Sequence, residues 1–522
     1  MPAELVGKFM EQKKWVRVVF RRRILIITLL AFQILLIIVL AIGTSKSFRF
    51  VDILLNCISI TVSLYIMNKQ EKSAYKITWI FLILLFPVFG GLVYVIFHTQ
   101  TNPRKLQKKI EDAAIQYKPY FFLPGNSLPR LKEQRIETEP QAHYLQEYAG
   151  FPVYTQTRAV YFNSGESFFE AVLEELPRAE KYIFLEFFIL RSGVMLNPII
   201  EILEKKAEAG LDVRIIYDDL GCFMTLPPNY RDELRQKGIK CTVFNPFKPI
   251  LSSLQNNRDH RKLICIDGKV AFTGGMNLAD EYINAKERFG HWKDAAIMLE
   301  GTAAWSFALI FLQMWNTQDQ IKKDEPESFY PWKDEECTEE NDGYVQPYAD
   351  SPIDTENVGE HVYIQIINNA KNYVYINTPY LVVDNDLLSA LTLSAKSGVD
   401  VRIITPHRWD KWIVAVASRS YYRQLILAGV KIYEYIQGFN HSKTFVCDDK
   451  TATVGTTNLD FRSLYLHFEC GVLLHGSGAI KAVKEDFQNT LPLCHEITLR
   501  DCARNAFQRI FQDVLRLFAP LM

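Results

Sequence analysis

Apolar positions follow two different patterns along the chain, and the change falls between residues 100 and 150. In the first hundred residues, Ile24–Gly43 and Ile77–Phe97 are uncharged runs of 20 and 21 residues, and Ile53–Met67 is a shorter run of 15. A helix of 20 residues spans about 30 Å, the thickness of a bilayer core. We therefore predict that residues 1–100 form a membrane anchor of two transmembrane helices, or of three if the shorter run also crosses.

Lysine and arginine flank the two long runs and predict which ends lie in the cytoplasm. Seven precede the first run and four follow the second, namely Lys8, Lys13, Lys14, Arg17, Arg21, Arg22 and Arg23, then Arg104, Lys105, Lys108 and Lys109. Two spans place both groups and the later part of the chain on the cytoplasmic side of the cell membrane, whereas three would place that later part outside. A cleaved signal peptide fits less well, because the first run is long, no small-residue cleavage site follows it and a second run comes soon after.

From about residue 150 short β-type runs alternate with helical periodicity, which predicts α/β units around a largely buried sheet. Strands are expected at 183–185 and 213–216, and again at 374–376 and 401–404. The second and fourth of these lie in near-identical segments, GLDVRII and GVDVRII. A repeat with an offset of about 190 residues is too long for a solenoid, so it indicates two similar domains, each a sheet with covering helices.

The repeat sets the predicted domain organisation. After the anchor we expect a linker at 101–150, a first α/β domain at 151–318, an acidic linker at 319–356 and a second α/β domain at 357–522. The stretch 319–356 holds 13 acidic and three basic residues together with four prolines, which is typical of a solvated connection. The C-terminal stretch Phe507–Met522 is amphipathic, which favours packing against the second domain, with contact with a membrane as the alternative.

Overall composition excludes some classes of protein. Lys+Arg and Asp+Glu are both 59, so the net charge is zero and gives no sign of a nucleic-acid partner. The nine cysteines are scattered and none forms a C-x-x-C pair, which predicts reduced cysteines rather than a disulfide framework or a zinc site.

One four-residue constellation occurs once in each half of the repeat. The two sets are His260, Lys262, Asp267 and Asn277, and His441, Lys443, Asp448 and Asn458. The spacings are identical: two residues from His to Lys, five from Lys to Asp and ten from Asp to Asn. In an alternating strand, residues two apart share a face, so His and Lys of both halves can face one pocket between the halves. The Asp stands at the far end of the same strand, where a turn begins.

These residue types suit phosphodiester chemistry. One imidazole can attack phosphorus and form a covalent phospho-histidine, while a second protonates the leaving oxygen and later deprotonates the incoming one. Lysines and asparagine amides can stabilise charge on the phosphoryl oxygens. An ammonium group has no free lone pair and repels a cation, so we expect neither a metal nor another cofactor in the reaction.

The paired H-x-K-x4-D motifs, each followed by G-x-x-N, resemble the phospholipase D superfamily. The closer resemblance is to bacterial cardiolipin synthases and covers nearly the whole chain, including Asn257–Lys262, Trp292–Asp294, Thr378–Tyr380 and Asn458–Ser463. It implies that one phosphatidylglycerol donates its phosphatidyl group to a histidine and a second accepts it, giving cardiolipin and glycerol at the lipid bilayer. By analogy with other members of the superfamily, His260 is expected to attack and His441 to transfer protons.

Further residues are candidates for supporting roles. A histidine nucleophile needs a carboxylate on its other nitrogen, and Asp294 is the expected partner of His260, with Glu469 that of His441. Glu186 follows a strand and either lines the pocket or is a buried structural carboxylate. Departures from the family pattern are local: Gly275 and Thr456 stand where Ser is common, His467 stands where Asn is usual, and Asn440 replaces a Leu.

Two other classes of function stay open at this point. The first is a phospholipase D-type hydrolase, or a phosphatidyltransferase to another alcohol such as ethanolamine or serine, because water and alcohols differ only in which one reaches the phospho-histidine. The second is a non-catalytic membrane scaffold with the same fold. The presence of both complete motifs argues against this class. The oligomeric state is not predicted.

Overall fold

The computed structural model describes residues 46–69, 71–86, 90, 91, 94, 103–247, 253–317, 324–333, 336–339 and 342–521. Two compact units contain them. The first covers the described part of Met1–Pro103 together with that of Phe247–Asn256, and the second covers Arg104–Pro246 and Asn257–Pro520. We call the second unit the catalytic body and describe each unit by itself.

The first unit contains the helices α2 (Lys46–Met67) and α3 (Ser73–Leu85). Ile66 packs with Trp79 and Ile83, while many other apolar side chains of both helices are exposed. None of the helices within the described residues is long and apolar enough to cross a membrane. The predicted span Ile24–Gly43 lies outside the described residues, and so does part of Ile77–Phe97. The run Ile53–Met67 is helical and forms the later part of α2, after turns that carry Lys46, Arg49 and Asp52.

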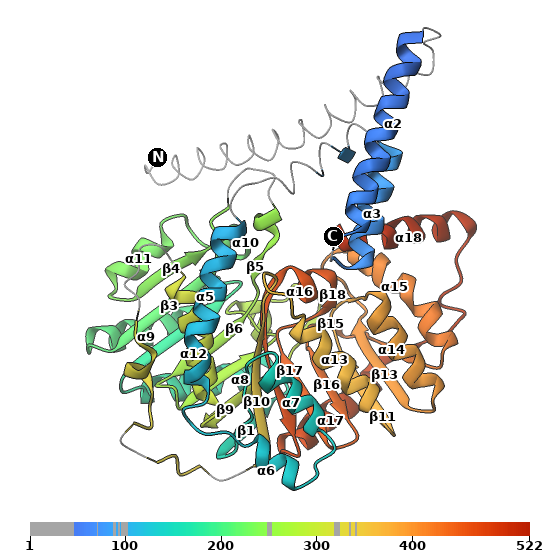
Figure 1. The fold of residues 1–522 in the computed structure, drawn as a ribbon. Coiled ribbons are helices and arrows are strands. Elements are labelled where there is room, and N and C mark those ends of the chain that lie inside the picture. Colours follow the sequence, from blue (N-terminus) through green and yellow to red (C-terminus); the bar gives the residue numbers. More distant parts are fainter. Residues whose placement is uncertain are drawn as a thin grey trace. The chain divides into compact units, whose positions relative to one another are not determined.

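The first half of the catalytic body is built on a seven-stranded mixed sheet in the order β1-β9-β7-β6-β2-β3-β4 (Figure 1). Its strands are β1 (Thr157–Phe162), β2 (Tyr182–Phe187), β3 (Asp212–Asp218), β4 (Lys240–Phe244), β6 (Lys262–Ile266), β7 (Val270–Gly274) and β9 (Ala296–Gly301). Its helices are α8 (Gly165–Glu175), α9 (Leu196–Glu208), α10 (Asp219–Cys222), α11 (Tyr230–Gln236) and α12 (Ala304–Asn316). The strands predicted at 183–185 and 213–216 are confirmed as β2 and β3, which pair in parallel.

The second half repeats this plan. Its sheet has the order β10-β19-β17-β16-β11-β13-β14-β20, with β5 (Arg258–Asp259) of the first half added beside β19. The strands are β10 (Tyr344–Asp350), β11 (Tyr373–Asn377), β13 (Asp400–Pro406), β14 (Lys431–Tyr435), β16 (Thr444–Cys447), β17 (Thr451–Gly455), β19 (His467–His475) and β20 (Cys494–Ile497). The helices are α13 (Val358–Asn369), α14 (Asn385–Lys396), α15 (Trp412–Leu427), α16 (Phe461–Tyr465), α17 (Ala479–Thr490) and α18 (Ala506–Phe518). The prediction of two similar α/β domains is therefore confirmed, with strands at 374–376 and 401–404.

One continuous apolar core joins the two halves. It contains side chains of the first sheet, such as Phe184, and of the second, such as Tyr375 and Val472. Helix α12 lies in this core with every residue except Gln313 buried, which explains its almost wholly apolar sequence. The other face of the first sheet packs against α8, α9 and α11. All nine cysteines are free in the structure.

The stretch 319–356 is not a simple linker, and this prediction is wrong for its C-terminal part. Residues 344–350 form β10, a buried strand that pairs antiparallel with β19. Pro347 is compatible with this position because β10 is the edge strand of its sheet, and among the described residues no named strand pairs with its outer side, which Tyr154 bridges at Val345. The acidic residues on either side concealed a short apolar strand.

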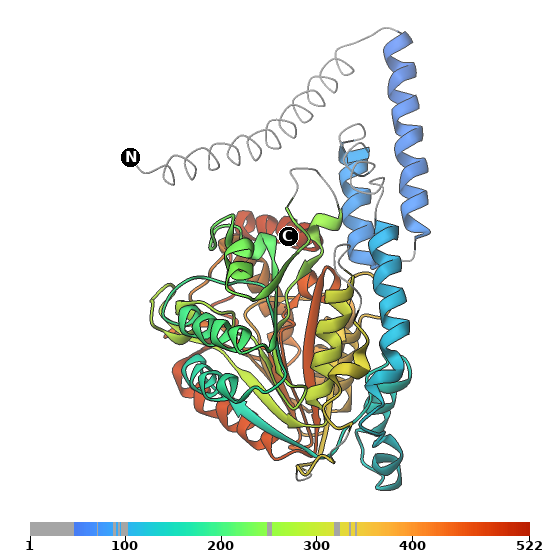
Figure 2. The same ribbon diagram turned by 90° about the vertical axis from the view of Figure 1, so that its left-hand side faces the viewer.

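The predicted linker at 101–150 is also structured. It forms α5 (Pro103–Phe121), α6 (Leu128–Glu133) and α7 (Glu139–Glu147). Tyr117 and Phe121 of α5 are buried, and Trp305 of α12 donates its indole N–H to the Tyr120 carbonyl over 2.8 Å. The segment after Pro103 is thus part of the catalytic body (Figure 2).

Candidate active site

Two short strand pairs between the halves bring the repeated motifs together. Strand β5 (Arg258–Asp259), just before His260, lies parallel to the start of β19 in the second half. Strand β15 (Gly438–Asn440), just before His441, lies parallel to β8 (His291–Lys293) in the first half. Each histidine therefore enters its own sheet after crossing to a strand of the other half.

Each histidine is held by a carboxylate from the other half. His260 Nδ1 lies 2.9 Å and 3.0 Å from the two oxygens of Glu469, and His441 Nδ1 lies 2.7 Å from Asp294 Oδ2. The predicted pairing of Asp294 with His260 and Glu469 with His441 is wrong. The physical reason is the crossing of the short strands. It places each histidine beside the strand that carries the carboxylate of the other half, rather than beside the equivalent strand of its own half.

The backbone repeats this crossed arrangement. The His260 N–H donates to the Phe468 carbonyl over 2.9 Å, and the His441 N–H donates to the Lys293 carbonyl over 2.7 Å. In each case the acceptor immediately precedes the carboxylate residue. Because an ionised carboxylate only accepts, it favours the tautomer with a proton on Nδ1, which leaves the lone pair on Nε2 for chemistry.

The motif lysines lie against the histidines. Lys262 donates to the His260 carbonyl, and Lys443 donates to the His441 carbonyl and lies 2.8 Å from His441 Nδ1. Both ammonium groups are buried. Each lysine also interacts electrostatically with the carboxylates Asp294 and Glu469. The histidines and lysines of both motifs therefore form one site with these two carboxylates.

Burial lowers the pKa of each basic group of this site. Burial, helped by Lys443, lowers the pKa of His441 to about 4, and burial together with Lys262 holds the pKa of His260 well below its usual value. Burial also lowers the pKa of Lys262 to about 8 and that of Lys443 to about 7. Both histidines are therefore neutral near pH 7, as a nitrogen nucleophile must be.

The surroundings shift the pKa values of the two carboxylates in opposite directions. Burial would raise the pKa of Asp294, but His441 and Lys443 outweigh it and hold that pKa below its usual value. Burial raises the pKa of Glu469 well above its usual value, because Lys262 and the hydroxyls of Thr456 and Ser463 oppose it less. The carboxylate beside His441 is thus ionised and better able to stabilise an imidazolium there.

The motif aspartates lie at the other end of their strands. Asp267 accepts backbone hydrogen bonds from 180, 181 and 182, at 2.7–2.8 Å, and Asp448 does the same at 371, 372 and 373, at 2.6–2.9 Å. Both have left-handed φ values, 53° and 51°, at the turns that begin there. Over the five residues of β6 this puts Asp267 roughly 16 Å from Lys262. These contacts fix the strands that carry the motifs.

The two motif asparagines are not equivalent. Asn277 is buried and fully engaged, since it accepts from the Ile189 N–H at 2.9 Å and donates to the Tyr282 hydroxyl at 2.6 Å. Asn458 is also buried, but within the described residues its side-chain oxygen has no hydrogen-bond partner. Asn458 is therefore the better placed of the two to bind a substrate.

Glu186 lies away from the motif histidines. It forms a buried ion pair with Arg261 at 2.6 Å, and Arg261 also binds Asp259 at 3.0 Å. Because Arg261 alternates with His260 and Lys262 along the chain, it points to the opposite face. The structure thus places Glu186 in a buried charge cluster behind the site.

Trp292 and His467 form a matched pair to which the sequence analysis assigned no role. Each stands two residues before the carboxylate of its half and directs a ring nitrogen at it, Trp292 Nε1 at 3.4 Å from Asp294 and His467 Nδ1 at 3.7 Å from Glu469. The His467 ring also lies 5.2 Å from that of His260. The equal spacing within the repeat was the signal that could have identified them.

The departures at Gly275 and Thr456 have a structural explanation. Both backbone N–H groups donate at 2.9 Å to the residue after the carboxylate, so the positions are equivalent. Thr456 donates its hydroxyl to Glu469. At Gly275 an added Cβ would lie 2.0 Å from Asp294 Oδ1, so only glycine leaves room for that carboxylate.

Three groups of the site lie close enough to bind a cation. Ligand atoms of His260, His467 and Glu469 are within 4.8 Å of one another. Lys262 and Lys443 both act on His260, and their positive charge opposes a second cation at this position. The donor set therefore fits an anion better than a metal.

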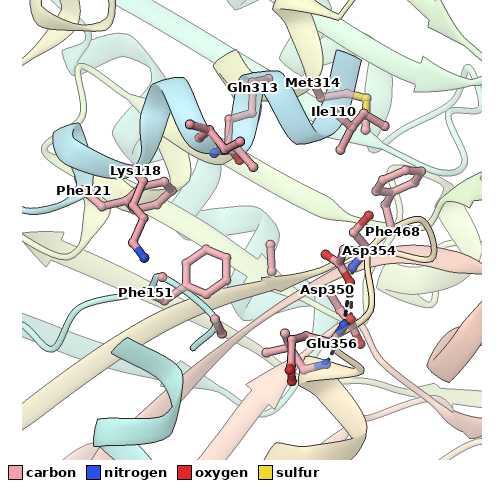
Figure 3. Close-up of a pocket in the computed structure, with 18 of the residues that line it drawn as sticks. Ile110, Lys118, Phe121, Phe151, Gln313, Met314, Asp350, Asp354, Glu356 and Phe468 are labelled. Atoms are coloured by element: carbon pink, nitrogen blue, oxygen red, sulfur yellow. Dashed lines mark hydrogen bonds between the residues drawn. The ribbon is translucent and has the colours of Figure 1, made fainter. Parts of the chain in front are cut away.

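A separate cavity of about 300 Å³ lies behind the same strands (Figure 3). Figure 3 shows Ile110, Met314 and Phe468 at one end of it and Phe121 and Phe151 at the other. Phe468 alternates with the residues that face the histidines, so the cavity is on the far side of β19 from Glu469. We assign it no part in the chemistry.

An α/β repeat that unites two histidines, two lysines and two buried carboxylates in one site is characteristic of enzymes of the phospholipase D type. Within that class the chain belongs to the cardiolipin synthase family. The family profile described as "Cardiolipin synthase, PLD-like domain" matches residues 172–304 and 363–491, and "Phospholipase_D-nuclease N-terminal" matches residues 57–97.

Individual relatives match nearly the whole chain. The chain is 36% identical to a cardiolipin synthase of Geobacillus thermodenitrificans over 479 residues, which cover 90% of this chain and 93% of the relative. It is 34% identical to cardiolipin synthase 2 of Bacillus anthracis, with 88% and 90% covered, and 44% identical to an uncharacterized protein of Streptococcus mutans, with 88% and 99% covered. The crystal structure of Haemophilus influenzae phosphatidylserine synthase has the same fold, with a TM-score of 0.52 at 14% identity over 71% of this chain and 95% of that one.

Proposed function

We propose that this protein is a cardiolipin synthase that transfers a phosphatidyl group from one phosphatidylglycerol to another. The observation that carries the proposal is the crossed pair of His–carboxylate units, each with a lysine, in one buried site. Its excess of cationic and hydrogen-bonding groups suits a phosphodiester. Relatives named as cardiolipin synthases, matched over about nine-tenths of the chain, support the same reaction.

The first half-reaction forms the covalent intermediate. The negative charge of the bound donor phosphate, together with Asp294, favours protonation of His441, so His441 enters the step as the imidazolium. His260 Nε2 attacks the phosphorus of the donor, the bond from phosphorus to the glycerol oxygen breaks, and His441 gives its Nε2 proton to that oxygen. Lys262 and Lys443 balance the charge of the phosphoryl oxygens, and bound phosphate in turn favours their protonated form. The ionised Asp294 supports the assignment of the proton to His441.

The second half-reaction reverses these roles. A hydroxyl of the acceptor phosphatidylglycerol gives its proton to His441 and attacks the phosphorus, and the bond between phosphorus and His260 breaks. Cardiolipin leaves, and both histidines return to their starting state. Trp292 and His467 are positioning residues in this scheme, because they contact the carboxylates Asp294 and Glu469 rather than the phosphate.

We also infer that the first unit associates with the cell membrane. Helices α2 and α3 expose large apolar side chains, among them Phe50, Ile53, Ile58, Leu64 and Leu84. The bilayer is where both substrates reside. A multi-pass anchor in residues 1–100 and a cytoplasmic face for the catalytic body remain predictions from the charged flanks.

The product of labelled phosphatidylglycerol tests the proposed function directly. Detergent-solubilised protein should convert it to cardiolipin and release glycerol in equal amounts. Accumulation of phosphatidic acid would instead identify a hydrolase, and new phosphatidyl esters formed only with added ethanolamine or serine would identify another transferase. No turnover by the intact enzyme, with the His260→Ala variant as the blank, would favour a scaffold.

A further inference from the structure

The C-terminal helix α18 has one polar and one apolar face. It starts at a capping box formed by Asn505 and Gln508. Phe507, Ile510, Phe511, Val514 and Phe518 recur at helical spacing and form the apolar face. Arg509, Gln512, Asp513 and Arg516 form the opposite face.

The orientation of α18 is the reverse of that of an ordinary surface helix. Its polar face borders the protein: Arg509, Gln512 and Asp513 line a cavity of about 460 Å³ together with residues of α15 and β14, with Gln512 half-buried and the other two exposed. Arg516 lies 4.2 Å from the ring of Tyr421 on α15. The apolar face is turned outward, with Phe507 78%, Ile510 62% and Val514 45% exposed, and no residue of α18 is buried.

The exposed apolar surface continues onto α15. The Trp412 ring stacks on Phe511 at 5.9 Å, and Trp412, Ile413 and Trp409 are themselves exposed. Figures 1 and 2 place α18 at the end of the catalytic body where α10 also lies. Tryptophan beside aliphatic and phenylalanine side chains is the composition found at membrane interfaces.

Basic residues accompany this surface. The segment 498–516 holds four arginines and two aspartates. Around Trp409, the basic residues Arg408 and Lys411 outnumber the one aspartate, Asp410. A bilayer with anionic lipids would attract this positive charge. A second copy of the chain is less suitable, because a symmetric dimer pairs the same patch with itself and would bring these like charges together.

We propose that α18 and the first turn of α15 form a membrane-docking face, which lies in the interface of a bilayer that contains anionic lipid. The face acts in addition to residues 1–100 and holds the catalytic body on the surface from which it takes lipid. The inference rests on the proposed lipid-transfer function, since it gives the body a reason to stay at the bilayer.

The test uses the full chain and two matched double variants. Phe507→Ser/Ile510→Ser removes two exposed apolar side chains from the face, and Leu393→Ser/Leu427→Ser removes two similarly exposed ones elsewhere. Cardiolipin formation is measured in phosphatidylcholine–phosphatidylglycerol vesicles and in mixed detergent micelles. We expect the first variant to lose at least about fivefold in vesicles while keeping its rate in micelles, and the control to keep both rates.

Direct contact is measured by quenching of tryptophan fluorescence with brominated phosphatidylcholine in the same vesicles. Wild type should be quenched more than Trp412→Phe. Equal quenching together with equal vesicle rates would overturn the docking face, and so would a concentration-dependent dimer that only the first variant loses. Absence of cardiolipin formation by wild type in micelles would instead refute the proposed function, and quenching would still decide on the face.

Discussion

The crossed pairing of histidines and carboxylates gives a prediction that pairing within each half would reverse. Glu469→Gln should impair His260, and Asp294→Asn should impair His441. A hydrogen bond to a charged group contributes about 1.5–3 kcal/mol, which is about 10- to 150-fold in rate. The loss rises toward about 10⁴-fold where the new amide turns its N–H to the ring and selects the wrong tautomer. With phosphatidylglycerol both variants should therefore be slow.

An activated substrate separates the two variants. A phosphatidyl ester with a good leaving group, such as nitrophenol, needs no proton from His441 to form the intermediate. Rapid quench of the phosphorus-labelled ester in alkaline denaturant, which preserves the P–N bond, should trap label on His260 at a near-normal rate in Asp294→Asn and much more slowly in Glu469→Gln. Glu360→Gln, which changes another buried carboxylate, is the control for folding, and it should melt and label like wild type.

The histidine that carries the label, and the rate of labelling in each variant, test the roles of the histidines and the crossed pairing separately. Label on His441 in the wild type would reverse the roles of the two histidines without touching the pairing. Label on His260 that forms slowly in Asp294→Asn and normally in Glu469→Gln would refute the crossed pairing itself. Full activity of either His260→Ala or His441→Ala with phosphatidylglycerol would refute the shared site.

Four further predictions follow from the same geometry. The pKa of Lys443 is about 7 and that of Lys262 about 8, so the free enzyme loses its cationic groups as the pH rises. The value of kcat/KM should therefore fall above about pH 7, whereas kcat, which is measured with the phosphate bound, should hold to higher pH. Coincident pH profiles of kcat/KM and kcat would contradict this. Turnover should survive excess EDTA, and a loss that Mg²⁺ or Zn²⁺ restores would argue against lysine-based charge stabilisation. Gly275→Ala should lower both activity and melting temperature through the clash with Asp294, whereas Thr456→Ser, which keeps the hydroxyl, should change either by little. The chain should stay in the membrane pellet after alkaline carbonate extraction, and its recovery in the soluble fraction would remove the anchor.

Local sequence patterns determined much of this protein. The strands at 183–185 and 213–216 and their counterparts 190 residues later follow from short runs of β-branched and aliphatic residues, and the structure confirms them. The repeated spacing of His, Lys, Asp and Asn placed two equivalent sets in two equivalent domains. These features are encoded within a few residues or by internal repetition, so they can be read without knowing how the halves meet.

Only the tertiary structure decided which groups act on one another. Glu469 reaches His260, and Asp294 reaches His441, because two-residue and three-residue strands cross between the halves, and such short pairings have no sequence signal of their own. The buried strand within 344–350 was concealed by flanking acidic residues, since its partner β19 lies more than a hundred residues away. Register between distant strands is set by packing of the common core, which no local pattern contains, and that packing is what turns two repeated motifs into one site.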